Sequence, residues 1–291
     1  VSYGTAIYKN FSEKNFNLLT SVIAPAFVLG LIGLWDDVKN ISPFFRFVFQ
    51  SAAGVFTAWI LISNKTVGNP TGFRSLDAII TVVWIVGICN SINFFDNVDG
   101  GAAGSIAIAS TATFLIAFSG KQYFISALAA VIAGAMFSFL IWNKSPARIY
   151  MGDAGALFLG ILIATLTIRL RPEAETKWTS LATPILLLAV PILDTSVAVI
   201  SRLRRKISPF QGGHDHLSHR LMRSGIQRKT AVITLWLLSG LFSVIAILIP
   251  LTSKLIEQSL TAVAAILWLI LFARFISCLL YTSDAADDTP C

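Results

Sequence analysis

Long apolar segments, separated by short polar stretches, run along most of the 291-residue chain. A transmembrane helix needs about 20 predominantly apolar residues. Nine segments approach or reach this length. They cover residues 17–35, 44–63, 78–95, 101–119, 123–142, 155–170, 179–201, 230–250 and 259–280. The pattern therefore predicts an all-α, polytopic membrane helical bundle with about nine spans.

The composition supports a membrane protein. Hydrophobic residues make up 55% of the chain and charged residues only 13%, whereas soluble domains carry about 25% charged residues. Because apolar segments spread over nearly the whole chain, we expect a single membrane domain over residues 1–280. Residues 281–291 form an abruptly polar tail, which we interpret as a remnant without function. The chain begins with Val1 and no signal peptide precedes the first apolar segment, so we expect that its natural N-terminus is missing.

The basic residues divide unequally between the two sets of loops that alternate along the chain. One set comprises 36–43, 95–101, 143–154 and 201–229, and with Arg46 it carries twelve Lys and Arg residues, eight of them in 201–229. Loops rich in Lys and Arg stay in the cytoplasm, so this set is predicted to face the cytoplasm. The net charge of +7 then reflects membrane orientation and phosphate ligands, and nucleic acid is not expected as a partner.

Five aspartates lie at the predicted cytoplasmic ends of spans, and a sixth, Asp194, lies within the seventh span. A carboxylate close to the membrane is costly, which makes it a candidate functional residue. Adjacent carboxylates repel each other and favour a nearby cation such as Mg²⁺. For Asp36 and Asp37, the alternative is a solvated helix end in which Lys39 is the partner of the carboxylates. The five are Asp36, Asp37, Asp96, Asp99 and Asp153.

Two polar segments surround most of these acids. Residues 90–104 place two Asn and then two Asp at intervals of three, followed by glycines that permit a tight turn. An Asx-rich turn explains part of this pattern, but it needs fewer polar groups. In residues 143–160, Asp153 stands between glycines just before a helix, where it can act as an N-cap and still bind a metal. Tyr150 can stack on a base or anchor the chain at the interface. For Asp194, Arg202 is a plausible structural partner.

The basic loop 201–229 contains all three histidines of the chain, His214, His216 and His219. A zinc site is one interpretation of their spacing, but no cysteine is present there and the surrounding cations disfavour a metal. A patch that binds lipid headgroups is the simplest interpretation. A loop that binds a diphosphate is the more specific one, because histidines among arginines suit phosphate contacts and proton donation.

Taken in order, these segments resemble the polyprenyl-phosphate N-acetylhexosamine-1-phosphate transferase family over about residues 17–225. Two departures from the family pattern are Ser218, where the family has a further histidine, and Asn97, where Gly is common. The family's additional N-terminal spans are also absent. The matching motifs are Asp36-Asp37-x-x-Asn40 followed by Arg46 and Gln50, Asn90-x-x-Asn93-x-x-Asp96-x-x-Asp99-Gly100, Asn143-x-x-Pro146-Ala147 with Met151-Gly152-Asp153-x-Gly155, Pro191-x-x-Asp194, and the histidine loop.

The resemblance implies a magnesium-dependent enzyme, with Mn²⁺ as an alternative ion, at the cytoplasmic face of a bacterial inner membrane. It would transfer a sugar 1-phosphate from a UDP-sugar to undecaprenyl phosphate, release UMP, and so initiate the synthesis of a cell-envelope glycan such as lipopolysaccharide or teichoic acid. The loop His216-Leu-x-His219-Arg220-Leu is most similar to that of GlcNAc-1-phosphate transferases. The phospho-MurNAc-pentapeptide transferases of peptidoglycan synthesis are the alternative relatives.

The resemblance also implies roles for individual residues. Asp36, Asp37 and Asp153 would be catalytic, with Asp153 and Asn93 as the metal ligands. The nucleotide would contact Asp96, Asp99, Asn143 and Tyr150, and the phosphates would contact His216, His219, Arg204 and Arg220. The expected partners are the UDP-sugar, the polyprenyl phosphate and the lipid bilayer, and a homodimer is left open.

Two other classes of protein compete with this interpretation. A proton-coupled secondary transporter also uses acids within the membrane, but it predicts acids near the midplane and inverted repeats. Here the acids gather at one face and no internal repeat is evident. A non-catalytic membrane scaffold predicts no cluster of Asp, Asn and Gly.

Overall fold

The structure is a computed structural model that describes residues 13–209 and 213–277, and these residues form helices joined by short loops, with no strand among them. The all-α prediction is confirmed. The elements are α2 (Glu13–Lys39), α3 (Pro43–Ser63), α4 (Arg74–Phe95), α5 (Gly101–Ser119), α6 (Tyr123–Asn143), α7 (Gly152–Arg169), α8 (Lys177–Leu187), α9 (Ala189–Arg204), α10 (Leu217–Arg223), α11 (Arg228–Leu248), the 3₁₀ turn η1 (Ile249–Leu251) and α12 (Lys254–Ser277).

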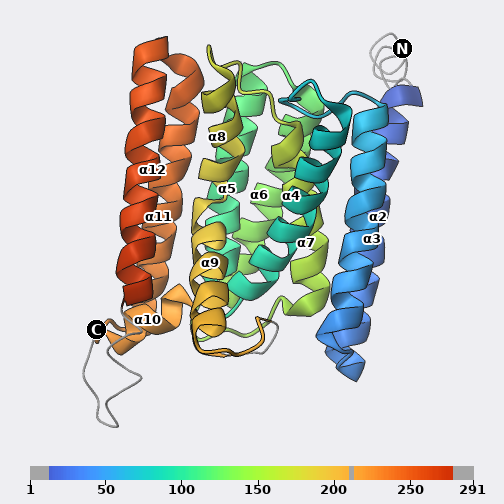
Figure 1. Cartoon of the computed structure of the whole chain (residues 1–291). Coiled ribbons are helices and arrows are strands. Elements are labelled where there is room, and N and C mark those ends of the chain that lie inside the picture. Colours follow the sequence, from blue (N-terminus) through green and yellow to red (C-terminus); the bar gives the residue numbers. More distant parts are fainter. Residues whose placement is uncertain (1–12, 210–212, 278–291) are drawn as a thin grey trace.

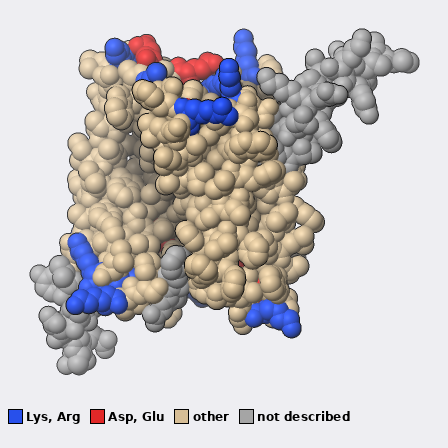
Figure 2. Space-filling model, turned by 45° about the vertical axis from the view of Figure 1, so that its right-hand side comes forward, with Lys and Arg blue, Asp and Glu red and all other residues tan. Residues whose placement is uncertain are grey.

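Most of these helices are suited to cross a membrane. Among the described residues, seven helices are long and apolar enough, namely α3, α4, α5, α6, α7, α11 and α12, and the bent pair α8–α9 raises the number to eight. The long helices run alongside one another (Figure 1), and charged side chains gather at the two ends with an uncharged belt between them (Figure 2). The prediction of a multi-pass membrane protein is confirmed.

The predicted number of about nine spans differs slightly from the seven or eight counted among the described residues. The first predicted segment, 17–35, lies within α2. The seven or eight helices that fit a span by length and composition among the described residues do not include α2.

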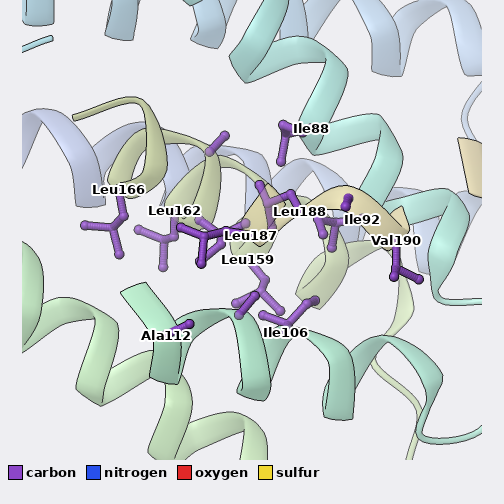
Figure 3. Packing of buried hydrophobic residues seen from close by; sticks show 14 of the residues in the cluster. Ile88, Ile92, Ile106, Ala112, Leu159, Leu162, Leu166, Leu187, Leu188 and Val190 are labelled. Atoms are coloured by element: carbon purple, nitrogen blue, oxygen red, sulfur yellow. The ribbon is translucent and has the colours of Figure 1, made fainter. Parts of the chain in front are cut away.

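The predicted span 179–201 is broken in the middle. It consists of α8 and α9, whose axes differ by 74° at Leu188. Pro191 explains the break, because proline has no N–H to donate to the carbonyl of Leu187 and its ring crowds that carbonyl. The break is buried, with Leu187 2% and Leu188 0% exposed. Figure 3 shows Leu187 and Leu188 among apolar side chains that include Ile88, Ile92, Ile106 and Leu159.

Close helix contacts bring the polar segments together at one end of the bundle. In α2, Gly33 lies so close to α7 that a Cβ would stand 2.3 Å from the carbonyl oxygen of Asp153. In α5, a Cβ at Gly104 would stand 2.2 Å from the Trp236 indole of α11. The loops α2–α3, α4–α5, α6–α7 and α9–α10 all lie at this same end (Figure 1). The predicted grouping of the acids and the histidine loop on one face is therefore present in the fold.

Candidate active site

Asp37 of α2 caps the N-terminus of α7. Its two carboxylate oxygens accept hydrogen bonds from the backbone N–H groups of Asp153 at 2.9 Å and Ala154 at 3.1 Å. These N–H groups have no partner within their own helix, and a negative charge is stabilised at a helix N-terminus. Gly152 makes room for this contact, since it has φ +65° and a Cβ there would lie 2.7 Å from an Asp37 oxygen. Asp37 thus fixes the position of Asp153, and its catalytic role stays a prediction.

Arg46 of α3 connects Asp36 with Asp153. One nitrogen of its guanidinium, Nη1, lies 2.5 Å from Asp36 Oδ2 and 2.7 Å from Asp153 Oδ2. The Asn93 amide of α4 donates a hydrogen bond to the other oxygen of Asp153. Asp36 is only 5% exposed, so its charge requires this cation. Residues from α2, α3, α4 and α7 therefore converge, and we call Asp36, Arg46, Asn93 and Asp153 the acid cluster.

Gln50 lies one helical turn from Arg46, on the same face of α3. It is 1% exposed, and neither its amide nitrogen nor its amide oxygen has a hydrogen-bond partner among the described residues. A buried amide without a partner is costly. Gln50 therefore adds an unused donor and an unused acceptor close to the acid cluster.

The α4–α5 loop carries Asp96 and Asp99. The pKa of Asp96 is raised to about 6, mainly by burial and further by the negative charges of Asp153 and Asp99. Asp99 accepts a hydrogen bond from the backbone N–H of Ala147 at 3.3 Å and faces the Arg228 guanidinium at 3.5 Å. The loop thus places two more carboxylates beside the acid cluster, one of which readily takes up a proton.

Asn143 and Tyr150 occupy opposite situations in the α6–α7 segment. Asn143 is 2% exposed, accepts a hydrogen bond from the N–H of Gly100 and donates one to the carbonyl of Ile149. Tyr150 is 74% exposed. The structure therefore uses Asn143 to fasten two loops together, while the ring of Tyr150 is open to a ligand. Their nucleotide roles remain predictions.

Asp194 orients a histidine of the basic loop. It accepts hydrogen bonds at 2.7 Å from His216 Nδ1 and at 2.7 Å from the backbone N–H of Leu217, at the start of α10. Arg202, suggested by the sequence as its partner, instead bonds Asp215 at 3.2 Å and lies over the ring of Phe94. The sequence-based suggestion for Asp194 was therefore wrong, because the true partner is far along the chain.

The four predicted phosphate-binding residues divide into two pairs. His216 is 6% and Arg220 2% exposed, and the Arg220 guanidinium donates to the carbonyls of Asp215 and Phe275 and to the Ser201 hydroxyl. Burial lowers the pKa of Arg220 to about 10. His219 is half-buried and Arg204 exposed. His219 and Arg204 are thus accessible to solvent, whereas Arg220 holds the loop, and the phosphate-binding roles stay predictions.

Two further titratable groups of this loop have shifted pKa values. Burial acts to raise the pKa of Asp215, but hydrogen bonds and charges from Arg205 and Arg202 outweigh it and hold the pKa below its usual range. Burial lowers the pKa of His219, and the neighbouring His214 and His216 lower it further. The imidazole of His219 is therefore neutral near pH 7, and its Nε2 lies 3.5 Å from Nδ1 of His214.

The histidine loop is also tied directly to the acid-bearing α4–α5 loop. The hydroxyl of Ser218 donates to Asn97 Oδ1 at 2.5 Å, and the amide nitrogen of Asn97 donates to the carbonyl of Phe94. These are the two positions at which the sequence departs from the resembled family. Each departure was visible in the sequence, but their contact was not.

The described residues form no preformed cage for a metal. Nowhere in residues 13–209 and 213–277 do three His, Cys, Asp or Glu side chains meet in a way that could hold a metal ion. Mg²⁺ does not require such a cage, because it binds through one or two carboxylates plus substrate phosphates and water. Asp153 and Asn93 are in contact, and a half-turn of the Asn93 amide would present its oxygen beside the carboxylate. The donor set therefore fits Mg²⁺.

Comparison with known proteins gives consistent results. The model of glycosyl transferase family 4 matches residues 19–171. A probable undecaprenyl-phosphate N-acetylglucosaminyl 1-phosphate transferase of Bacillus subtilis is 31% identical over 265 residues, which cover 89% of this chain and 70% of that protein. A phospho-N-acetylmuramoyl-pentapeptide-transferase of Streptococcus uberis is 29% identical over 62% of this chain and 57% of its own. A phospho-N-acetylmuramoyl-pentapeptide-transferase of Streptococcus equi is 27% identical over 244 residues, which cover 77% of this chain and 70% of that protein.

Proposed function

Because the chain belongs to glycosyl transferase family 4, we propose that it transfers GlcNAc 1-phosphate from UDP-GlcNAc to undecaprenyl phosphate and releases UMP. The similarity to a probable enzyme of this kind over 89% of the chain supports the choice of reaction. The observation that carries the proposal is the acid cluster, in which carboxylates from α2 and α7 converge on Arg46 at the end of the bundle that also holds the histidine loop.

The reaction exchanges one phosphoanhydride bond for another. An oxygen of the lipid phosphate attacks the phosphorus that is linked to the sugar, and the bond from that phosphorus to the oxygen of UMP breaks. The leaving oxygen keeps the electron pair as part of the UMP phosphate. Little covalent chemistry is left to the protein, so catalysis consists of positioning the two phosphates and offsetting their charge.

The acid cluster would perform both tasks. Asp153 and Asn93 would hold Mg²⁺, and Mn²⁺ would suit the same oxygen ligands. When bound, the ion would offset negative charge on the diphosphate. Asp37 keeps Asp153 in place through the two backbone N–H groups of α7. Asp36 would orient the lipid phosphate, which is itself already ionised near pH 7.

Arg46 is the residue that must change partners. It neutralises Asp36 and Asp153 together through one nitrogen, and the carboxylate of Asp153 must be released before it can serve a metal. A guanidinium freed in this way would bind the incoming phosphates, for which its planar donors are suited. The buried amide of Gln50, unpaired within the described chain, is placed to bond one of the groups that move.

The remaining residues would bind the nucleotide and the phosphates. Tyr150 presents an exposed ring for stacking on the base, and Asp96 and Asp99 would lie along the ribose and base. On the opposite side, His219 and Arg204 would contact phosphate oxygens. His216, whose Nδ1 bonds Asp194 and whose Nε2 lies 3.4 Å from Nη2 of Arg202, would position this loop beside the phosphates.

The site would face the cytoplasm of a bacterial cell, at the inner membrane. Eight basic residues in 201–229 lie at this end of the bundle, and basic loops remain in the cytoplasm. A nucleotide sugar is soluble and cytosolic, while the acceptor is anchored in the bilayer, so the chemistry must occur where the two meet.

The test is release of UMP by the purified protein in nanodiscs with undecaprenyl phosphate, Mg²⁺ and a panel of UDP-sugars. We expect turnover with UDP-GlcNAc that stops when Mg²⁺ is chelated. The two pentapeptide-transferase relatives make UDP-MurNAc-pentapeptide the second candidate donor, so the panel includes it. UMP release with that donor alone would replace the sugar assignment, and no UMP release with any donor would overturn the proposed reaction.

A further inference from the structure

A cavity opens where α6 ends, at the same end of the bundle as the acid cluster. Its volume is about 350 Å³. It is lined by Ile141, Trp142, Lys144, Ser145, Pro146 and Arg148. None of the positions to which sequence analysis gave a catalytic, nucleotide or phosphate role lines this cavity.

The cavity lies at the end of a helix that is long and apolar enough to span a membrane, which is the depth expected for lipid headgroups. One wall of the cavity comes from the last turn of α6, a helix that fits a membrane span over Tyr123–Asn143. Ile141 is 62% and Trp142 51% exposed on the outside of the bundle. Tryptophan is enriched at the interface between hydrocarbon and headgroups, because its ring is apolar with one polar edge. The lining therefore passes from apolar to polar at the membrane boundary.

The polar part of the lining is cationic, and its charges are unused. Neither the ammonium of Lys144 nor the guanidinium of Arg148 has a hydrogen bond or ion pair to any other described part of the chain. The Arg148 guanidinium lies 5.7 Å from the centre of the Trp142 ring, where a cation–π contact holds it over the cavity wall. No acidic residue lines the cavity. Two cations thus face one cavity without a counter-charge.

This cavity is separate from the acid cluster, although residues 141–148, at the end of α6 and the start of the α6–α7 loop, lie between the cavity and the α4–α5 loop. Residues that alternate with the lining residues make contacts on the other side of the segment. Asn143 bonds Gly100, and the backbone N–H of Ala147 bonds Asp99. The segment therefore presents one side to the α4–α5 loop and the other, with Lys144 and Arg148, to the cavity.

We propose that this cavity binds the phosphate group of an anionic membrane lipid. The two unpaired cations would hold the phosphate oxygens, and Ile141 and Trp142 would contact the adjoining glycerol and upper chain. A soluble phosphate would gain nothing from the apolar wall, whereas a lipid phosphate meets both parts at the depth where it already lies. The proposal concerns binding alone and does not rest on the proposed reaction.

The test measures lipid binding to the full chain in nanodiscs of phosphatidylcholine doped with labelled phosphatidylglycerol. Undecaprenyl phosphate is the ligand in a second arm, and inorganic phosphate is a soluble competitor in a third. Arg148→Gln and Lys144→Gln remove one charge each, and Arg148→Lys keeps the charge. Lys39→Gln is the matched control, because Lys39 is an exposed cation at the same end of the bundle that does not line the cavity.

We expect each Gln substitution in the cavity to weaken lipid binding about fivefold, since one basic residue near an anionic surface contributes about 1 kcal/mol. Lys39→Gln should leave binding unchanged, and Arg148→Lys should retain most of it. The arm that shows this dependence identifies the lipid. Equal losses for Lys39→Gln and Arg148→Gln would mean general attraction to the surface and would overturn the proposal. Binding of inorganic phosphate that depends on Arg148, without any such dependence for either lipid, would also overturn it.

Discussion

Replacing Arg46 with Gln tests how the acid cluster is held together. Arg46 is the cation that connects Asp36 and Asp153, at 2.5 Å and 2.7 Å. Without it, two carboxylates from different helices face each other with no positive charge between them. We expect Arg46→Gln to be less stable than the wild type when no divalent cation is present. We also expect it to be stabilised more strongly by Mg²⁺, because the ion no longer competes with a guanidinium.

The size of the effect follows from burial. Removing one partner of a fully buried ion pair costs about 3–5 kcal/mol. Arg46 is 19% and Asp153 25% exposed, so water screens part of the loss, and about 2 kcal/mol is expected for this group. For a protein of this size about 1 kcal/mol corresponds to about 2–4 °C in Tm. The Tm of Arg46→Gln should therefore fall by about 5 °C.

The assay is thermal unfolding in detergent, with EDTA and with increasing Mg²⁺, and no substrate. Lys177→Gln removes an exposed cation at the opposite end of the bundle and serves as the control for net charge. It should match the wild type at every Mg²⁺ concentration. If Arg46→Gln shows the wild-type Tm in EDTA and the wild-type response to Mg²⁺, then Arg46 does not hold the acids together and the reasoning is wrong.

Two further substitutions examine the contacts that surround the acid cluster. Gly33→Ala should lower stability by more than about 2 kcal/mol, because the new Cβ would stand 2.3 Å from the Asp153 carbonyl oxygen. Gly87→Ala, at a position on α4 where a Cβ meets nothing within 4 Å, is the control and should be neutral or stabilising. Equal Tm values for Gly33→Ala and Gly87→Ala in thermal unfolding would refute the close contact between α2 and α7. Asn97→Ala and Ser218→Ala should each cost about 1 kcal/mol, and the double variant should cost less than the sum because one hydrogen bond joins them. A strictly additive result in denaturant unfolding would show that the bond between the loops is absent.

Much of the architecture followed from local pattern. Apolar length identified the spans, and alternation of the loops correctly grouped Asp36, Asp99 and Asp153 with the histidine loop. The break between α8 and α9 was missed although Pro184 and Pro191 both lie inside the predicted span. Two prolines within one apolar segment were the signal that could have revealed it.

The details of the site depended on tertiary contacts that no local pattern reveals. Asp194 pairs with His216, 22 positions away, rather than with the nearby Arg202. Asp37 caps a helix more than a hundred positions further along the chain, and Arg220 turns inward to bond carbonyls of the protein. In each case the residue type was correctly marked as unusual, but its partner was set by the packing of helices distant in sequence.

The central claim is that the acid cluster catalyses release of UMP, and Asp153→Asn tests it most directly. In this variant the backbone N–H of residue 153 still bonds Asp37 and Arg46 keeps its ion pair with Asp36, so the protein should fold, with a Tm no lower than that of Arg46→Gln. With UDP-GlcNAc, undecaprenyl phosphate and Mg²⁺, we predict that UMP release falls at least about a hundredfold, as for loss of one charge-stabilising group in other enzymes. Glu175→Gln, an exposed acid at the other end, should release UMP at the wild-type rate. Wild-type turnover by folded Asp153→Asn would contradict the claim.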